Sequence, residues 1–366
     1  AGHTDTVFPR ETDLTLKKRG GRYSCPGIGD DTRAVAELFS LARALNATGI
    51  RGEGDIVFCA NVCEEGLGDL RGIKHAFKDM TVAKEKTEFL ESVQLSKKTE
   101  SMESVQFSKK TESMKSSAFS TKSKNHYDGF VSIDDKNTSG IIYQAVGSER
   151  YLVTFRGTGG HSFTGFGIPN PIHAMGRAIA KISDFQTPKN PKTTFSVGVV
   201  NGGTSVNVIA AECSMLVDMR SVNAEELTRL SAKFHQAIED AVQEENARWE
   251  DKENPVTVTF EQKGKRPAGI QDKSCQIVQA ANAANQALGM ETLYIGAAST
   301  DANIPISLGI PAITVGWGGK GGGEHTIHEW YEHAESWKGP QRDLLLLLAL
   351  SGYEGVREYQ LPQING

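Results

Sequence analysis

Acidic and imidazole side chains occur at scattered points of the 366-residue chain, each in or beside a Gly-rich or strand-like stretch. They are His3-Thr4-Asp5, Asp30-Asp31, Glu64-Glu65, Asp134 and His325. These residue types suit a hydrolytic site that holds two divalent metal ions. Three carboxylates and a bridging hydroxide would balance the four positive charges of the two ions. Two neutral histidines would each supply one further ligand, one to each ion. The carboxylates are Asp30, Glu65 and Asp134, and the histidines are His3 and His325. Glu64 then remains free to move protons.

Several of these residues also have simpler interpretations. Asp30 and Asp31 precede a helical pattern and could cap it, and Asp31 fits a cap or a supporting hydrogen bond better than metal binding. Two neighbours compete with predicted ligands: His328 with His325, and Asp135 with Asp134.

Length and composition limit the function classes. A chain of 366 residues exceeds one typical domain of roughly 100–200 residues, which predicts two domains. The net charge of −5, without a basic stripe of interleaved aromatics, gives no indication of a nucleic-acid or membrane partner. The run LLLLLAL within 343–350 is shorter than the ~18 residues of a membrane span and predicts a buried helix. Five cysteines without CxxC spacing favour buried thiols. No signal-peptide pattern is visible, and we expect a cytoplasmic protein.

Helix and strand patterns flank the candidate ligands. Residues 31–48 carry apolar side chains at helical spacing, and Gly49 suits the end of a helix. The apolar run 55–63 predicts a buried parallel strand with Glu64 and Glu65 at its C-terminal end, where open α/β sheets place active sites. Further predicted elements are a helix capped by Asp272 and ending at Gly289, strands at 293–296 and 310–315, and a helix N-cap at Thr300 and Asp301.

Residues about 80–124 form a Ser, Lys, Thr and Glu-rich stretch that repeats a twelve-residue unit, ESVQLSKKTESM followed by ESVQFSKKTESM. Its aliphatic content is too low for a core, so we interpret it as a solvated insertion. The unit is also shorter than those of solenoid repeats.

Residues 147–264 follow the order strand, helix, strand, strand, helix, strand. The strands are expected at 151–156, 194–200, 211–219 and 256–261, and the helices at 171–185 and 224–249. Asn223 and Glu226 have the spacing of a capping box. This order predicts a small sheet covered on one face by two helices. Because candidate ligands lie on both sides, we predict that this domain is inserted into a metal-binding domain formed by 1–146 and 265–366.

Eight short motifs, in order along the chain, resemble the zinc metallopeptidase superfamily that includes peptidase T, glutamate carboxypeptidase, acetylornithine deacetylase, succinyl-diaminopimelate desuccinylase and aminoacylase. The motifs are GHTDTVFP, PGIGDDTRA, VCEEGLGDLRG, GFVSID, GGHSFTGFG, VNVIAAECSMLVDMR, STDAN and HTIHEWYE. The resemblance, nearest to peptidase T, covers nearly everything outside the repeat insertion. It implies an α/β fold, with a zinc-exopeptidase-like catalytic domain of mixed sheet and helices on both faces, and an inserted two-layer α+β dimerisation (lid) domain.

The resemblance also implies roles for single residues. His3, Asp30 and Asp134 would hold one zinc ion and Asp30, Glu65 and His325 the other, with Asp30 bridging; Co²⁺ or Mn²⁺ could replace zinc. Asp5 would orient His3, and Glu64 would be the general base. His325 is preferred to His328 because the family shows a His followed four positions later by Glu, here Glu329.

In the inserted domain, three further residues match family positions. The resemblance implies that His161 reaches across a homodimer to stabilise the oxyanion in the partner's site, and that Asn207 and Arg220 contact substrate, Arg220 by gripping a carboxylate. His161 and Arg220 could instead make an interdomain hydrogen bond and a surface ion pair.

Two departures from the family pattern carry expectations of their own. The chain begins two residues before His3, where family members have a substantial N-terminal portion, so we expect the catalytic sheet to lack strands. The interval from Glu65 to Asp134 is longer than in the family, which predicts that the insertion loops out and leaves Asp134 in place.

The first functional hypothesis is a dinuclear zinc exopeptidase for short peptides, of the tripeptide aminopeptidase or dipeptidase type. The second is an N-acyl amino acid amidohydrolase, such as a deacetylase or an aminoacylase. The third is a truncated non-enzyme that keeps at most a dimerising module. The first two reactions break the same kind of bond, so the ligands do not choose between them.

Overall fold

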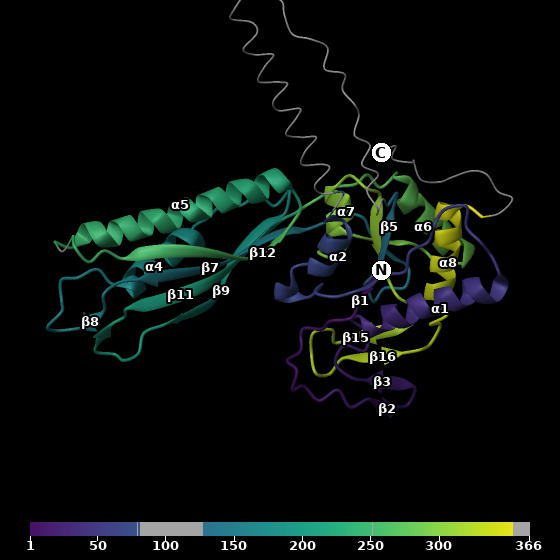
Figure 1. The fold of residues 1–366 in the computed structure, drawn as a ribbon, viewed down its shortest axis with the longest axis horizontal. Coiled ribbons are helices and arrows are strands. Elements are labelled where there is room, and N and C mark those ends of the chain that lie inside the picture. Colours follow the sequence, from purple (N-terminus) through teal and green to yellow (C-terminus); the bar gives the residue numbers. More distant parts are fainter. Residues whose placement is uncertain (79, 81–126, 251, 354–366) are drawn as a thin grey trace, which may run out of the picture.

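The computed structural model describes residues 1–78, 80, 127–250 and 252–353. Figure 1 shows two lobes, which we call the main lobe (β1 to β6 and α6 to α8) and the lid lobe (β7 to β12). Apart from Met80, the predicted insertion at about 80–124 and its repeat lie outside the described residues.

The main lobe is built on a mixed sheet with the strand order β13-β6-β14-β5. The strands are β5 (Phe130–Ile133), β6 (Gly140–Ile142), β13 (Leu293–Ile295) and β14 (Ala312–Val315). β14 runs parallel to β5 and antiparallel to β6. Backbone hydrogen bonds from Ala1 to Val131 and from Ile133 to Ala1 bring β1 (Gly2–His3) alongside β5, and β1 pairs in parallel with β4 (Ala60–Asn61). Beyond β5, the main-lobe sheet is therefore continued by β1 and β4.

Helices cover both faces of this sheet. They are α1 (Thr32–Thr48), α2 (Arg71–Ala76), α6 (Gln276–Ala287), α7 (Asn303–Ser307) and α8 (Lys338–Ser351). In β14, Ile313 and Val315 pack in the core with α1, α6 and α8, whereas Ala312 packs with α7 on the other side. Helix α8 is only half-buried, because Leu346 is buried and Leu345 is 40% exposed. Among the described residues, no helix combines the length and the apolar content needed to cross a membrane.

A smaller antiparallel sheet, with the order β15-β16-β3-β2, joins the two ends of the sequence. Its strands are β2 (Lys17–Arg19), β3 (Arg22–Ser24), β15 (Lys320–Gly322) and β16 (Trp330–Glu332). Pairing of β16 with β3 places the loop 323–329 beside the segment 25–30. Two candidate ligands, His325 and Asp30, are thus brought close by one strand pairing.

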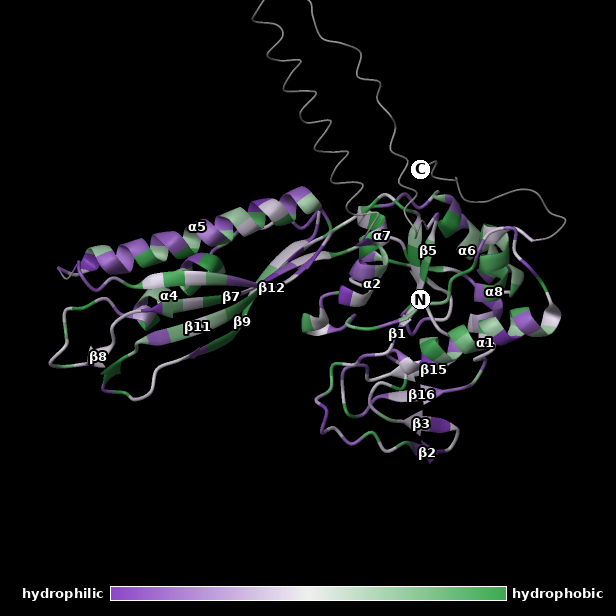
Figure 2. Ribbon diagram, in the orientation of Figure 1, coloured by the Kyte–Doolittle hydropathy of each residue, from purple (hydrophilic) through white to green (hydrophobic). Residues whose placement is uncertain are grey.

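The lid lobe is an antiparallel sheet with the order β12-β7-β11-β9 and two helices on one face (Figure 1). Its elements are β7 (Gly147–Arg156), β8 (Gly160–His161), α4 (Pro171–Ser183), β9 (Thr193–Gly202), β10 (Val208–Ile209), β11 (Glu212–Ser221), α5 (Ala224–Arg248) and β12 (Thr257–Arg266). Along β11, Cys213, Met215 and Val217 are buried on the same face, in a core shared with both helices. Hydrophobic and hydrophilic residues alternate along α5 in Figure 2, as expected of a helix with one buried face. The predicted two-layer arrangement is confirmed.

Helix boundaries in the lid lobe follow local caps. Asn223 accepts a hydrogen bond from the backbone N–H of Glu226, and Asn170 accepts one from Ile172 at the start of α4. These bonds satisfy N–H groups that have no partner within the helix. In the main lobe, Gly49 ends α1 with a φ of 68°, as its position in the sequence predicts.

Three local predictions are wrong. Only Ala60–Asn61 of the apolar run 55–63 forms a strand, and Val57 is 61% exposed, because within the described residues β4 pairs only with the two-residue strand β1. Helix α6 begins at Gln276, and Asp272 instead accepts a hydrogen bond from the backbone of Ser274 in the preceding turn. Neither Thr300 nor Asp301 is the N-cap of α7, which is Ala302, and the buried carboxylate of Asp301 accepts a hydrogen bond from Asn61.

Candidate metal centre

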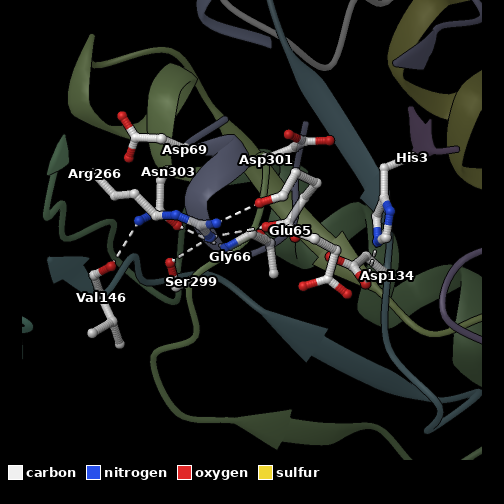
Figure 3. A network of polar contacts seen from close by, with 12 residues as sticks. His3, Glu65, Gly66, Asp69, Asp134, Val146, Arg266, Ser299, Asp301 and Asn303 are labelled. Atoms are coloured by element: carbon white, nitrogen blue, oxygen red, sulfur yellow. Dashed lines mark hydrogen bonds and ion pairs between the residues drawn. The ribbon is translucent and has the colours of Figure 1, made fainter. Parts of the chain in front are cut away.

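His3 and two carboxylates form the first cluster of candidate ligands. His3 ends β1 and is 1% exposed, Asp30 lies in the turn before α1, and Asp134 follows β5. Nε2 of His3 lies 3.0 Å from Oδ1 of Asp30 and 3.8 Å from Oδ1 of Asp134. Figure 3 shows the imidazole of His3 pointing toward Asp134. The predicted ligands of one ion are therefore adjacent.

His325 and Glu65 form the second cluster with the same aspartate. Nε2 of His325 lies 3.0 Å from Oδ2 of Asp30 and 3.0 Å from Oε1 of Glu65. Glu65 immediately precedes the short 3₁₀ helix η1 (Gly66–Gly68), and His325 lies between β15 and β16. Asp30 thus offers one carboxylate oxygen to each histidine, which is the geometry of a bridging carboxylate.

The donor set fits two divalent cations. Imidazole nitrogen and carboxylate oxygen are ligands that zinc takes, and the ligand atoms of Asp30, Glu65 and His325 lie within 4.8 Å of one another. Oδ1 of Asp30 is buried, and its near neighbour is another candidate ligand atom, Nε2 of His3 at 3.0 Å. Crowding several buried carboxylates costs free energy that bound cations would offset. The residues therefore fit a dinuclear site.

Burial and the crowding of charges also shift the pKa values of the candidate ligands in the metal-free cluster. Burial raises the pKa of Asp134 to about 6, although His3 opposes the shift. Burial and the neighbouring charge of Asp30 raise the pKa of Glu65. Burial alone would lower the pKa of His325, but Glu65 and Asp30 raise it. Carboxylates and imidazoles thus share protons that a metal ion would have to displace.

Asp5 supports the backbone of the second cluster. Its Oδ1 accepts a hydrogen bond from the N–H of Glu64 at 3.1 Å, and its Oδ2 accepts one from the N–H of Glu65 at 3.0 Å. The backbone oxygen of Asp5 lies 3.0 Å from Nδ1 of His3, whereas its carboxylate is 3.7 Å from the same atom. Asp5 therefore contacts His3 mainly through its backbone and fixes the two glutamates through its side chain.

Glu64 is buried beside the cluster and pairs with an arginine that the sequence did not single out. Its Oε1 lies 3.0 Å from Nη1 of Arg266, the last residue of β12, and Nη2 of Arg266 donates to the backbone oxygen of Glu64. Nη1 also donates to Ser299 at 3.1 Å. Figure 3 shows this guanidinium reaching toward Ser299 and the turn at Glu65 and Gly66. A residue at the end of a lid strand therefore touches the proposed general base.

The competing residues lie differently. Asp31 has no capping hydrogen bond, and its Oδ2 accepts one from the backbone N–H of His3. A carboxylate oxygen of Asp31 also lies within 4.8 Å of ligand atoms of His3 and Asp134, so Asp31 remains a competitor of Asp30 at the first ion. The carboxylate of Asp135 accepts from the side chain of Asn137. His328 is exposed, and the candidate metal clusters found among the described residues include His325 instead.

The three candidate residues of the lid lobe are not gathered at this cluster. His161 is exposed on β8, which Figure 1 shows at the end of the lid lobe far from β1. Asn207 accepts a hydrogen bond from Ser205 in the exposed loop before β10. Arg220, on β11, donates from Nε to Oδ2 of Asp218 at 2.7 Å. Within one chain, the ligands and Glu64 come together, and the lid residues remain apart.

Arg220 is nevertheless linked to the main lobe. Oδ1 of Asp218 accepts a hydrogen bond from Nε of Arg150 at 2.9 Å, and Nη1 of Arg150 donates to the backbone oxygen of Gly66 at 2.7 Å. Gly66 directly follows Glu65. A chain of three charged side chains therefore connects the lid sheet with the turn that carries a candidate ligand.

Comparisons with known proteins agree with this fold. Residues 143–246 match the model of the peptidase dimerisation domain family. Over 114 residues the chain is 30% identical to the succinyl-diaminopimelate desuccinylase of Nitrosospira multiformis, a match that covers 30% of this chain and 30% of the relative's length. Two solved structures align with 94% of this chain and 78% of their own chains: the aminopeptidase PepT of Bacillus cereus (TM-score 0.65, 19% identity) and a tripeptidase of Staphylococcus aureus (TM-score 0.66, 18% identity).

The family match shows that residues 143–246 are similar to a peptidase dimerisation domain, and the two structural alignments show that the chain shares the fold of the aminopeptidase and the tripeptidase. The class of protein is thus a mixed α/β domain with an inserted dimerisation domain, and the fold predicted from the eight motifs is confirmed.

Proposed function

We propose that the chain is a dinuclear zinc hydrolase that cleaves the amide bonds of short peptides, as a tripeptide aminopeptidase or a dipeptidase. The observation that carries this proposal is the position of Asp30, 3.0 Å from both His3 and His325 through its two oxygens. His3 and Asp134 would hold one ion, and His325 and Glu65 the other. When bound, the two ions would polarise the scissile carbonyl and supply a nucleophilic water at neutral pH.

Glu64 is the proposed general base and acid. Glu64, His3 and Glu65 form one cluster of candidate ligand atoms within 4.8 Å of one another, so Glu64 is close enough to take a proton from a water at the ligands and return it to the leaving amine. Asp5 would hold Glu64 and Glu65 in place through their backbone N–H groups.

The lid lobe would complete the site in a homodimer. Exposed His161 and Asn207 are available to a second copy, and the match to a dimerisation domain supports association through this lobe. In this proposal His161 stabilises the oxyanion in the partner's site, and Arg220 and Asn207 bind the substrate. Arg220 is 41% exposed, which leaves its guanidinium accessible to a substrate carboxylate.

A second candidate function is hydrolysis of N-acyl amino acids. The specific observation in its favour is the 30% identity to a desuccinylase over 114 residues. A peptide and an N-acyl amino acid both present an amide near a carboxylate, so the same ligands and the same arginine would serve either substrate.

Zinc-loaded protein assayed with free tripeptides, dipeptides, N-acetyl amino acids and N-succinyl amino acids would separate the two functions. Turnover of tripeptides or dipeptides above the acylated amino acids supports the peptidase, and the reverse order supports the amidohydrolase. Glu64→Gln should lower kcat by roughly 10²- to 10⁴-fold, whereas Glu53→Gln, on an exposed residue, should leave it unchanged. No turnover of any substrate, with no bound metal, would contradict both and favour a dimerising non-enzyme.

A further inference from the structure

Glu329 is a buried carboxylate that binds the loop carrying Asp30. It directly precedes β16 and is 1% exposed. Its Oε1 accepts hydrogen bonds from the N–H groups of Gly29 at 2.7 Å and Asp30 at 2.8 Å, and its Oε2 accepts one from Gly27 at 2.6 Å. One side chain therefore binds three backbone N–H groups within four residues.

The same residue is fixed to the loop of His325. Its own N–H donates to the backbone oxygen of Thr326, the neighbour of His325, and its carbonyl accepts from the N–H of Cys25. Both the main chain and the side chain of Glu329 thus span the gap between the two segments. Asp30 and His325 are far apart in the sequence and are joined here by one residue.

The packing at this contact is close. A Cβ atom at Gly29 would lie 3.1 Å from Oε1 of Glu329 and 3.3 Å from the ring of Trp317. Within the described part of the chain Glu329 forms no ion pair with Lys or Arg, so its carboxylate is compensated by the backbone N–H groups of Gly27, Gly29 and Asp30. Burying a carboxylate in this way is costly, and a role in packing would not require the charge. The loop 27–30 depends on both carboxylate oxygens of Glu329, because its N–H groups donate hydrogen bonds to each of them.

We propose that Glu329 is a positioning residue that fixes the carboxylate of Asp30 relative to His325 before metal binds. This inference rests on the proposed dinuclear site. Because Asp30 touches both histidines, a shift of its backbone would disturb the ligands of both ions together. Residues that orient metal ligands commonly change metal affinity when they are replaced.

The first test is Glu329→Gln with zinc as the probe. A glutamine offers one acceptor oxygen to three N–H donors, and its amide NH₂ would face donors. We expect zinc affinity, measured by competition with a chromophoric chelator, to fall on the order of 10- to 100-fold. The matched control is Glu332→Gln, three residues along on β16, whose partner is the half-exposed Arg22 and which should keep wild-type affinity.

Readouts other than activity separate positioning from general stability. The visible absorption of bound Co²⁺ should change in Glu329→Gln and not in Glu332→Gln, because it reports ligand geometry. A variant with a lower melting temperature but unchanged zinc affinity and Co²⁺ spectrum would overturn the proposal. Wild-type protein that binds no zinc would refute the metal site itself, which is a different failure.

A measurement on the wild-type chain keeps the test valid if Glu329→Gln does not fold. Metal-free protein should protect the amides of Gly27, Gly29 and Asp30 from hydrogen exchange, because Glu329 already holds them. Protection that develops only after zinc is added would show that the metal, not Glu329, orders this loop, and would overturn the proposal.

Discussion

Among the described residues, Arg266 is the only arginine or lysine in an ion pair with Glu64, and replacing it with methionine removes that pair. Methionine keeps much of the volume of the aliphatic stem, so the change mainly removes the guanidinium. Arg266 is 4% exposed and Glu64 is 5% exposed. The pair is therefore buried, and the variant leaves a carboxylate in a site that water barely reaches.

The expected cost follows from this burial. Removing one partner of a buried ion pair typically destabilises a protein by about 3–5 kcal/mol, whereas an exposed pair contributes about 0–1 kcal/mol. Burial and Asp134 already raise the pKa of Glu64 well above its usual range, and Arg266 opposes that shift. Without Arg266, Glu64 is expected to take up a proton more readily, which places the loss toward the lower end of the range at mildly acidic pH.

Urea unfolding of metal-free protein at neutral pH measures this loss directly. Arg22→Met, which breaks the exposed pair with Glu332, is the matched control and should cost less than about 1 kcal/mol. The double variant Arg266→Met with Glu64→Gln should recover much of the stability, because both charges are then gone. A loss in Arg266→Met no larger than in Arg22→Met would refute the reasoning.

Three further changes have expected outcomes. Burial and the neighbouring Asp343 raise the pKa of Glu37. The stability of the wild type should therefore fall as the pH rises from the usual glutamate range through this raised pKa. In thermal unfolding, Glu37→Gln should remove that part of the pH dependence and gain about 1 kcal/mol at neutral pH. Asp218→Asn weakens the ion pair that orients Arg220, so it should raise KM for substrates with a free carboxylate more than it lowers kcat. An equal rise in KM for the same substrates with that carboxylate converted to an amide would contradict this. Asn223→Ala should cost about 1 kcal/mol in chemical unfolding, because the first turn of α5 loses its cap; an unchanged midpoint would count against that role.

The lid lobe was predictable from sequence because its signals are local. The alternation along β11, the period of α5 and the cap at Asn223 each depend on residues a few positions apart. The run 55–63 was wrongly predicted to be a buried strand, because an apolar composition does not reveal how many neighbouring strands a segment pairs with. Only Ala60–Asn61 pairs, and the rest stays half-exposed.

The candidate ligands could be proposed from residue types in motifs, but the residues that support them could not. Arg266 reaches Glu64 across 202 positions, and Glu329 reaches Asp30 across 299. No local pattern marks either contact, since the first depends on how the end of β12 meets the turn after β4 and the second on the pairing of β16 with β3. Glu329 was visible only as a neighbour that helped to choose His325, and its contact with the loop of Asp30 required the structure.

The central claim is that Asp30 bridges two metal ions, and metal content per chain after zinc reconstitution and desalting tests it most directly. We expect about two zinc ions in the wild type, about one in His325→Ala, and less than one in Asp30→Asn, because only Asp30 serves both ions. Inductively coupled plasma mass spectrometry gives these numbers. No stoichiometric zinc in the wild type, or as much zinc in Asp30→Asn as in His325→Ala, would contradict the account.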